Sequence, residues 1–268
     1  MKVRIHRERP DPWPVRRERI RPAWTLPFWA MEWIFEWIAF ALSRWTFLDV
    51  LEYLEGFSVL IAVIFYFSES GDRLKQKHYQ AWQVINTAQG KGGSGGRVEA
   101  LEELNTDGVS LVGVDVSGAF LQGLRLKRAR LTRANFSTAD LRDSDLAFAD
   151  FSDASLHFTN FRQGNLRNVS FQHAYLDDAD FTGADLSAAD LDDADLRCVD
   201  LTDANLAGAT LANADLSNTT LSNLHWREIR SLKKANIFGV KNPPEGFVAW
   251  AKQHGAVQIK SDCPHPAP

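Results

Sequence analysis

The stretch that decides the fold is residues 179–196, ADFTGADLSAADLDDADL, in which Ala, Asp and then Leu or Phe return every five residues. The same period runs through 111–226, where every fifth position, here called the centre, is apolar. Of the 24 centres, 17 are Leu and 5 are Phe. The residue two positions before the centre is Ala in 14 repeats. A five-residue pattern that recurs this regularly predicts a fold built from stacked structural repeats.

A five-residue period fits neither the 3.6-residue turn of an α-helix nor the two-residue alternation of a simple strand. It fits a short extended piece followed by a corner. Because side chains two positions apart point to the same side of an extended chain, the centre and the small residue before it both point inward. The Asp or Asn between them points outward. Four such pieces close one coil, whose narrow interior leaves room for little beyond Ala beside each centre.

This pattern resembles the pentapeptide-repeat family, whose repeat is Ala, Asp or Asn, Leu and two variable residues. The resemblance covers roughly 45% of the chain and implies an all-β, right-handed quadrilateral β-helix of about six coils over residues 106–230. At ~4.8 Å per coil, the stack is expected to be roughly 29 Å long. An open end exposes unpaired backbone groups, so we expect a capping helix over 98–105 and a C-terminal cap over 231–258.

Composition divides the rest of the chain. Residues 1–27 are basic and rich in Pro, which predicts a disordered arm, and a disordered tail is expected over 259–268. The overall net charge of −4 does not indicate nucleic acid as a partner. The two cysteines, Cys198 in a repeat and Cys263 in the tail, predict neither a disulfide framework nor a thiolate metal site. A reducing compartment and the absence of a secretory signal are the corresponding expectations.

Residues 28–89 are predicted to be helical. Two apolar stretches, 28–42 and 47–67, allow three interpretations: a short hairpin inserted in a membrane, amphipathic helices lying on a membrane or a partner, or a soluble helical bundle. Flanking Trp and basic residues favour the hairpin, with both termini in the cytoplasm of a bacterial inner membrane. A polar extension to residue 89 and a Gly-rich linker over 90–97 come next. The acids in these stretches have no assigned role: Glu32, Glu36, Glu52 and Glu55.

Two sets of charged residues are candidate contact surfaces. In the acidic part of the repeats, the corner acids Asp192, Asp193 and Asp203 stand at positions that the repeat leaves variable, so they are a candidate partner surface. A basic patch nearer the helical segment is a candidate lipid-facing surface. Its members are Arg125, Lys127, Arg128, Arg130 and Arg133. The sequence shows no catalytic constellation, no cofactor motif and no metal-ligand spacing.

The sequence therefore favours a membrane-anchored, non-enzymatic scaffold that presents a rigid acidic β-helix to an unknown cytoplasmic protein, with membrane lipid as a second partner. One alternative is an oligomeric membrane protein that passes ions and carries the β-helix as an appendage. A second alternative comes from the family resemblance, since an acidic rod can imitate DNA and bind a nucleic-acid enzyme.

Overall fold

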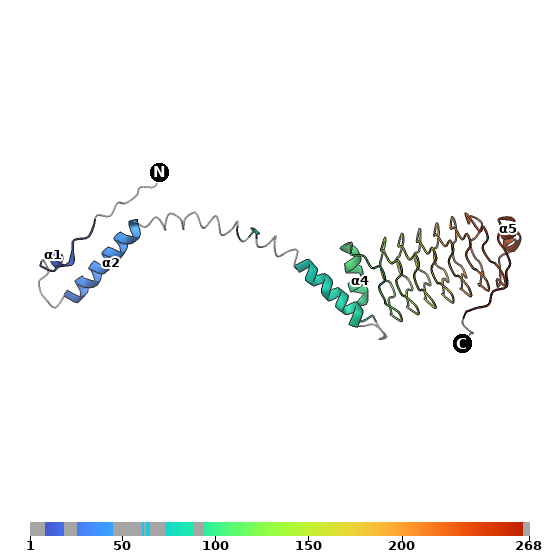
Figure 1. Ribbon diagram of the computed structural model, residues 1–268, viewed down its shortest axis with the longest axis horizontal. Helices are drawn as coiled ribbons and strands as arrows, with labels where there is room; N and C mark the ends of the chain where they lie inside the picture. Colours follow the sequence, from blue (N-terminus) through green and yellow to red (C-terminus); the bar gives the residue numbers. More distant parts are fainter. Residues whose placement is uncertain are drawn as a thin grey trace. The chain divides into compact units, whose positions relative to one another are not determined.

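The structure, a computed structural model, forms two units, Met1–Leu74 and Lys75–Pro268, and each is described by itself. The second unit holds a stack of coils between the helices α4 (Arg97–Thr106) and α5 (Phe247–Gln253), as Figure 1 shows. The first unit contains α1 (Trp13–Glu18) and α2 (Leu26–Arg44). The residues that the structure describes are 9–18, 26–44, 61, 63, 64, 73–87 and 94–264.

The coil contains four pentapeptides, as the repeat predicts. Residues 20 positions apart form parallel bridges, so that Asp115 pairs with Asn135 and Asn135 with Ser155. Four ladders of such bridges run along the stack, one on each side of the coil. They are named here first to fourth, and they begin at Asp115, Phe120, Arg125 and Arg130. Each side contributes one bridged residue per coil, so the paired segments are shorter than ordinary strands.

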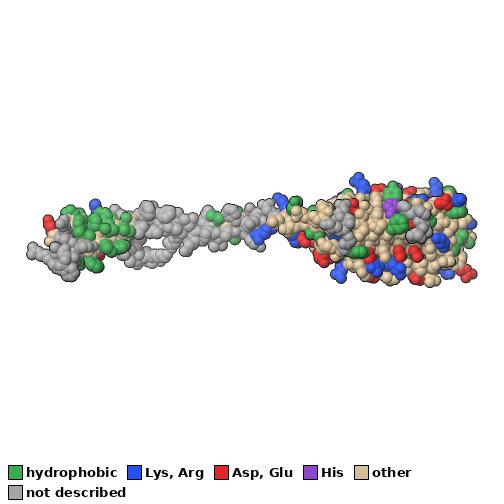
Figure 2. Space-filling model, turned by 90° about the horizontal axis from the view of Figure 1, so that it is seen from below, with side chains coloured by type: hydrophobic (Ala, Val, Ile, Leu, Met, Phe, Trp, Pro, Cys, Tyr) green, Lys and Arg blue, Asp and Glu red, His purple; other side chains and the backbone are tan. Residues whose placement is uncertain are grey.

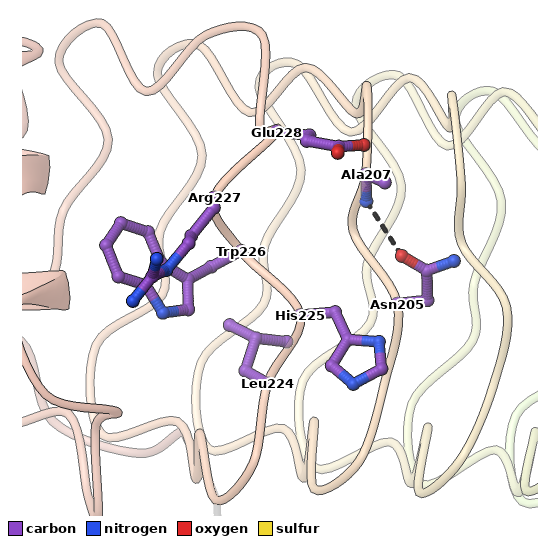
Figure 3. Close-up of a pocket in the computed structure, with 7 residues that line it drawn as sticks. All are labelled: Asn205, Ala207, Leu224, His225, Trp226, Arg227 and Glu228. Carbon is purple, nitrogen blue, oxygen red and sulfur yellow. Dashed lines mark hydrogen bonds between the residues drawn. The ribbon is translucent and has the colours of Figure 1, made fainter.

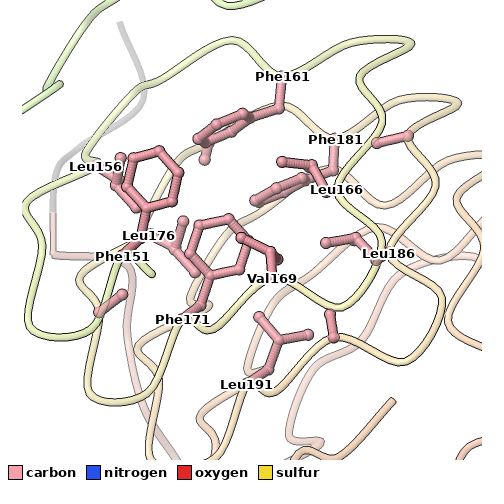
Figure 4. Packing of buried hydrophobic residues seen from close by; sticks show 14 of the residues in the cluster. Phe151, Leu156, Phe161, Leu166, Val169, Phe171, Leu176, Phe181, Leu186 and Leu191 are labelled. Carbon is pink, nitrogen blue, oxygen red and sulfur yellow. The ribbon is translucent and has the colours of Figure 1, made fainter. Parts of the chain in front are cut away.

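The interior is filled by the centres. Leu141, Leu186 and Leu206 are buried, as the period predicts. Centres 20 residues apart lie above one another, so the Phe residues form stacks: the rings of Phe161 and Phe181 are 4.8 Å apart and nearly parallel (Figure 4). Apolar area of this kind removed from water is the main stabilising contribution to such a fold. The core therefore runs as one column along the whole stack.

The corners have a fixed backbone conformation. The second residue after the centre is left-handed throughout the regular repeats, with φ near 59° at Asp153 and near 57° at Gln163. The first corner residue donates its N–H to the Asp or Asn two positions earlier, as Ser152 does to Asp150 at 3.0 Å. Thr202 does the same to Asp200 at 2.9 Å. This bond explains why Asp or Asn recurs before the centre.

The coil stack continues beyond the predicted end at residue 230. After His225 the spacing of bridged residues rises from 20 to 21, so that Thr210 pairs with Ser231 and Thr220 with Lys241. Arg230 and Ser231 together stand where other repeats have one outward residue, between the buried Ile229 and the buried Leu232. This single insertion breaks the five-residue period, and the sequence pattern alone therefore ends too early.

Helices close both ends of the stack. Leu101 and Leu104 of α4 are buried against the first coil, and Glu102 accepts a hydrogen bond from the backbone N–H of Arg125 at 2.8 Å. At the other end, Phe247 of α5 is buried and its ring lies 5.5 Å from that of Trp226. Both caps cover backbone that an open β-helix would expose.

The helical residues 75–87, where the sequence predicts a polar extension, pack with the N-terminal cap of the coil stack. Ile85 is buried against the cap, and Lys77 forms a 2.7 Å ion pair with Glu103 of α4. Arg97, which the sequence places in a flexible linker, is buried and begins α4; burial lowers the pKa of its guanidinium. Of the predicted linker 90–97, the structure describes residues 94–97, which form a turn and the helix start.

The first unit corrects the expectation of a disordered arm over 1–27 for residues 9–18. These residues lie against α2, where the rings of Trp13 and Trp33 are 5.6 Å apart. Arg16 pairs with Glu36 and lies 3.9 Å from Glu32. The two acids are one helical turn apart and share a face of α2, so a single guanidinium of the arm reaches both.

A membrane-spanning hairpin finds no support in the described part of the chain. None of the described helices combines the length and the apolar character needed to cross a membrane. Most of the second apolar stretch, 47–67, including Glu52 and Glu55, lies outside the described residues.

Candidate interaction surfaces

The three acidic candidates do not form one surface. Asp192 and Asp193 lie at the corner between the fourth ladder, which includes Asp190, and the first. Asp203 lies between Asp200 of the second ladder and Asn205 of the third, which is the diagonally opposite corner. The sequence brings these residues within 12 positions, but the four-sided coil separates them. A single partner face cannot contain all three.

Local conformation accounts for these acids in part. Asp193 and Asp203 have φ near 60° and 57°, a left-handed conformation that Gly, Asn and Asp adopt most readily. Asp192 accepts a hydrogen bond from the backbone N–H of Ala212 in the next coil at 2.7 Å. The corner backbone therefore favours Gly, Asn or Asp, although equivalent corners also hold residues such as Phe148 and Cys198. Gly at the equivalent corners of the first repeats is the sequence signal that could have shown this: Gly113, Gly118 and Gly123.

Carboxylates on the ladders are tied to neighbouring groups. The hydrogen bond from Arg142 lowers the pKa of Asp140. Burial alone would raise the pKa of Asp185, but hydrogen bonds from Ser187 and Arg167 outweigh it and the net pKa is lowered. These side chains are held ionised by the coil itself, so their presence does not by itself indicate a ligand.

Charge is divided along the stack. Residues 111–170 contain eight Lys or Arg and six Asp, whereas residues 171–226 contain eleven Asp and one Arg. The acids of the second group occupy all four ladders. The stack therefore has a mildly basic half next to α4 and a strongly acidic half toward α5, which the sequence describes only as a generally acidic rod.

The basic candidates lie together. Arg125 is on the third ladder and Arg130 on the fourth, and Lys127 and Arg128 form the corner between them. Arg133 occupies the next corner, so the five residues make a belt around half of the first coil. Lys127 pairs with Asp145 of the next coil at 2.8 Å. The structure thus brings this predicted set into one continuous surface.

A pocket of about 570 Å³ opens beside the belt. Its lining joins Lys127 and Arg128 to Phe148 and Arg167 from the two following coils. The Arg128 guanidinium lies 5.7 Å from the centroid of the exposed Phe148 ring, a cation–π distance. Sequence reasoning missed Phe148 and Arg167, although their separations of about 20 and 40 residues from Arg128 are the signal that places them on one corner.

A second pocket, of about 470 Å³, lies near the C-terminal cap (Figure 3). Residues 224–228 line it, together with Asn205 and Ala207 of the coil before. The Arg227 guanidinium is 5.9 Å from the Trp226 ring. His225 and His157 are isolated in the sequence, but His225 lines this pocket and His157 pairs with Asp177 one coil later. In the described part of the chain, no cluster of three His, Cys, Asp or Glu could hold a metal.

The two cysteines form a disulfide, contrary to the expectation from sequence. Cys198 is at a corner between the first and second ladders, and Cys263 reaches it across 65 residues with a Cα–Cα distance of 5.8 Å. The sequence predicts a disordered tail over 259–268, but residues 259–263 run back along the coils. Two lone cysteines far apart in sequence give no local signal of such a contact.

Comparison with known proteins finds pentapeptide repeats. The family model for pentapeptide repeats matches eight copies, over residues 110–147, 149–187 and 184–223. A pentapeptide repeat protein of the Arabidopsis thaliana thylakoid lumen is 34% identical, with a TM-score of 0.38, over 40% of this chain and 74% of that chain.

Two further solved structures are similar. The plasmid-mediated fluoroquinolone resistance protein QnrB1 is 19% identical, with a TM-score of 0.30, over 56% of this chain and 78% of that chain. HetL, a pentapeptide repeat protein involved in heterocyst differentiation regulation from the cyanobacterium Nostoc, is 25% identical, with a TM-score of 0.23, over 50% and 78%. No curated protein matches the chain. With its five-residue register over 111–226, its four-sided coils and the family match, this chain belongs to the pentapeptide-repeat family, whose members fold as right-handed quadrilateral β-helices.

Proposed function

We propose that the protein is a non-enzymatic interaction scaffold that the N-terminal unit attaches to a membrane surface. The observation that supports a scaffold is the placement of the side chains within each repeat. Two of the five side chains fill the interior, and the other three lie on the outside at positions fixed by the coil. Binding chemistry is therefore confined to the surface, which is a rigid array with a spacing of ~4.8 Å between coils.

An exposed apolar row on α2 supports attachment to a membrane. Phe28 and Phe35 are 79% and 63% exposed, and Met31 and Ile38 lie on the same face at helical spacing. Figure 2 shows apolar side chains gathered over this helix. Adjacent to the row, Glu32 and Glu36 face the arm through Arg16. A helix with an apolar row and a charged flank suits a position in the plane of the bilayer surface.

Basic residues around α2 suit an anionic headgroup region. The arm before α2 is rich in Arg, and each Lys or Arg near an anionic surface contributes about 1 kcal/mol. This geometry favours the sequence-based interpretation of helices lying on the membrane over that of a spanning hairpin. In this proposal the acidic half of the rod, residues 171–226, faces a partner with basic groups.

Vesicle binding tests the attachment. The full chain is expected to sediment with vesicles of phosphatidylcholine and phosphatidylserine, and the double variant Phe28→Ser/Phe35→Ser to bind them roughly tenfold more weakly. Full burial of a Phe side chain contributes about 1.5–3 kcal/mol, and the bilayer surface buries only part of each ring.

The matched control is Phe120→Ser/Phe158→Ser. These two rings on the coil stack are 56% and 43% exposed and lie outside the basic belt, so non-specific binding by exposed Phe would affect both pairs alike. Retained binding by the α2 variant, or an equal loss in the control, would contradict attachment through α2.

A further inference from the structure

The tail that follows the last bridged residue binds the coil stack through its own backbone atoms. The side chain of Asn236, on the first ladder, donates to the carbonyl of Ile259 at 2.9 Å and accepts from the N–H of Ile259 at 3.0 Å. One amide thus satisfies both backbone groups of a single tail residue. A planar amide that pairs with a peptide unit in this way binds an extended chain through its backbone, whatever the side chain of the bound residue.

Two more coils continue this contact toward α4. Asn218 donates to the carbonyl of Ser261 at 2.8 Å, and Arg197 donates to the carbonyl of Asp262 at 3.5 Å. Only one hydrogen bond to a tail side chain is described along this path, between the Ser261 hydroxyl and Asp215 at 3.1 Å. Asn236, Asn218 and Arg197 come from three successive coils, so they form a line of backbone-binding groups along the stack, here called the track.

We propose that the track is a docking site for an extended segment of a partner protein, and that residues 259–263 occupy it in the manner of an internal ligand. This inference rests on the proposed scaffold function and names the class of partner segment. Backbone hydrogen bonds supply affinity in such a mode, as in strand addition to a sheet edge. The site accepts many sequences, because three of its side chains bind backbone atoms.

The Cys198–Cys263 disulfide controls access to the track. While it is closed, the internal ligand cannot leave. A dithiol reductant transfers two electrons and two protons, the S–S bond becomes two thiols, and the reductant leaves as a disulfide. The tail is then held by hydrogen bonds alone, and a partner segment competes with it. A short tether keeps the tail at an effective concentration of order millimolar, which sets the affinity that a competitor needs.

The surface beyond the end of the track indicates which side chains a longer partner segment would carry. The corner that carries Cys198 holds Asp178 one coil earlier and the exposed Phe158 two coils earlier. A segment that extends past the position of Cys263 toward α4 reaches this corner. An extended peptide with an apolar residue there complements the exposed ring of Phe158.

A labelled peptide with the sequence of residues 258–264, carrying Ser in place of Cys263, tests the site. The receptor is the full chain with Ile259→Pro and Cys263→Ser, because Pro lacks the N–H that Asn236 binds and Ser removes the cross-link. Fluorescence anisotropy is expected to show binding to this variant and none to the oxidised native chain. Circular dichroism of the variant checks that the coil stack is folded.

Two substitutions at corners of that receptor test whether the peptide binds at the track. Asn218→Gly removes the donor to the peptide and is expected to weaken binding roughly fivefold to tenfold. Asn223→Gly is the matched control, since Asn223 is also a left-handed corner residue, with φ near 54°, but lies between the second and third ladders. Gly suits both positions.

The proposal is overturned if the peptide does not bind the released receptor, if it binds the oxidised native chain equally well, or if both Gly variants weaken it alike. Vesicle attachment through α2 does not depend on the track. Loss of peptide binding with intact vesicle binding therefore rejects only the docking site.

Discussion

Leu186→Asp is expected to unfold the coil stack or to lower its free energy of unfolding by more than about 4 kcal/mol. Leu186 is 1% exposed and lies in the apolar column between the centres Leu166 and Leu206. An Asp there places a carboxylate in that column without an ion-pair partner, and it also leaves a gap where Leu filled space. Urea denaturation of the full chain, followed by circular dichroism, measures the effect.

Ala188→Asp provides the control two residues further on. Ala188 is exposed and left-handed, with φ near 58°, a conformation that Asp adopts more readily than Ala. The same new charge is expected to change stability by no more than about 0.5 kcal/mol. Equal tolerance of Asp at both positions would show that the inward and outward assignment is wrong.

Reducing the Cys198–Cys263 disulfide is expected to lower stability by up to about 4 kcal/mol. The bond closes a loop across 65 residues, and the chain-entropy model gives this value for the restriction it places on the unfolded chain. For a domain of this size, the melting temperature should fall by roughly 10 °C. Thermal melts of the oxidised chain with and without dithiothreitol measure the difference.

The Cys263→Ser variant separates this bond from other effects of the reductant. Its melting temperature is expected to match that of the reduced native chain and to be unaffected by dithiothreitol. Two titratable thiols in native protein purified under oxidising conditions would contradict the pairing, and so would a melt that reduction leaves unchanged.

The coil could be predicted from sequence because every repeat shows the same five-residue pattern of inward and outward side chains. Inward and outward positions, four pentapeptides per coil and the column of centres all arise from a local pattern of five residues. The pattern fails at Arg230 and Ser231, where one added residue breaks the period but the coil accommodates both residues at the outward position on the fourth side. The pattern also does not show the left-handed backbone of the corners, a conformation that favours residues such as Asp193 and Asp203.

The contacts between segments far apart in the chain could not be predicted from the sequence. The Arg16 pairs with Glu32 and Glu36, the packing of Ile85 against the N-terminal cap, and the Cys198–Cys263 bond each join residues that no periodic pattern relates. The basic belt and its pocket form an intermediate case. The belt is contiguous in sequence, whereas Phe148 and Arg167 join it only once 20 residues are known to make one coil.

Hydrogen–deuterium exchange of the full chain, with and without anionic vesicles, tests the central claim most directly, because it observes both units at once. We predict that vesicles slow exchange in α2 and its neighbouring arm, while amides of the coil stack between 111 and 241 are already protected and do not change. Unchanged exchange across 26–44, or rapid exchange along the coil stack, would contradict a rigid scaffold that α2 attaches to a membrane surface.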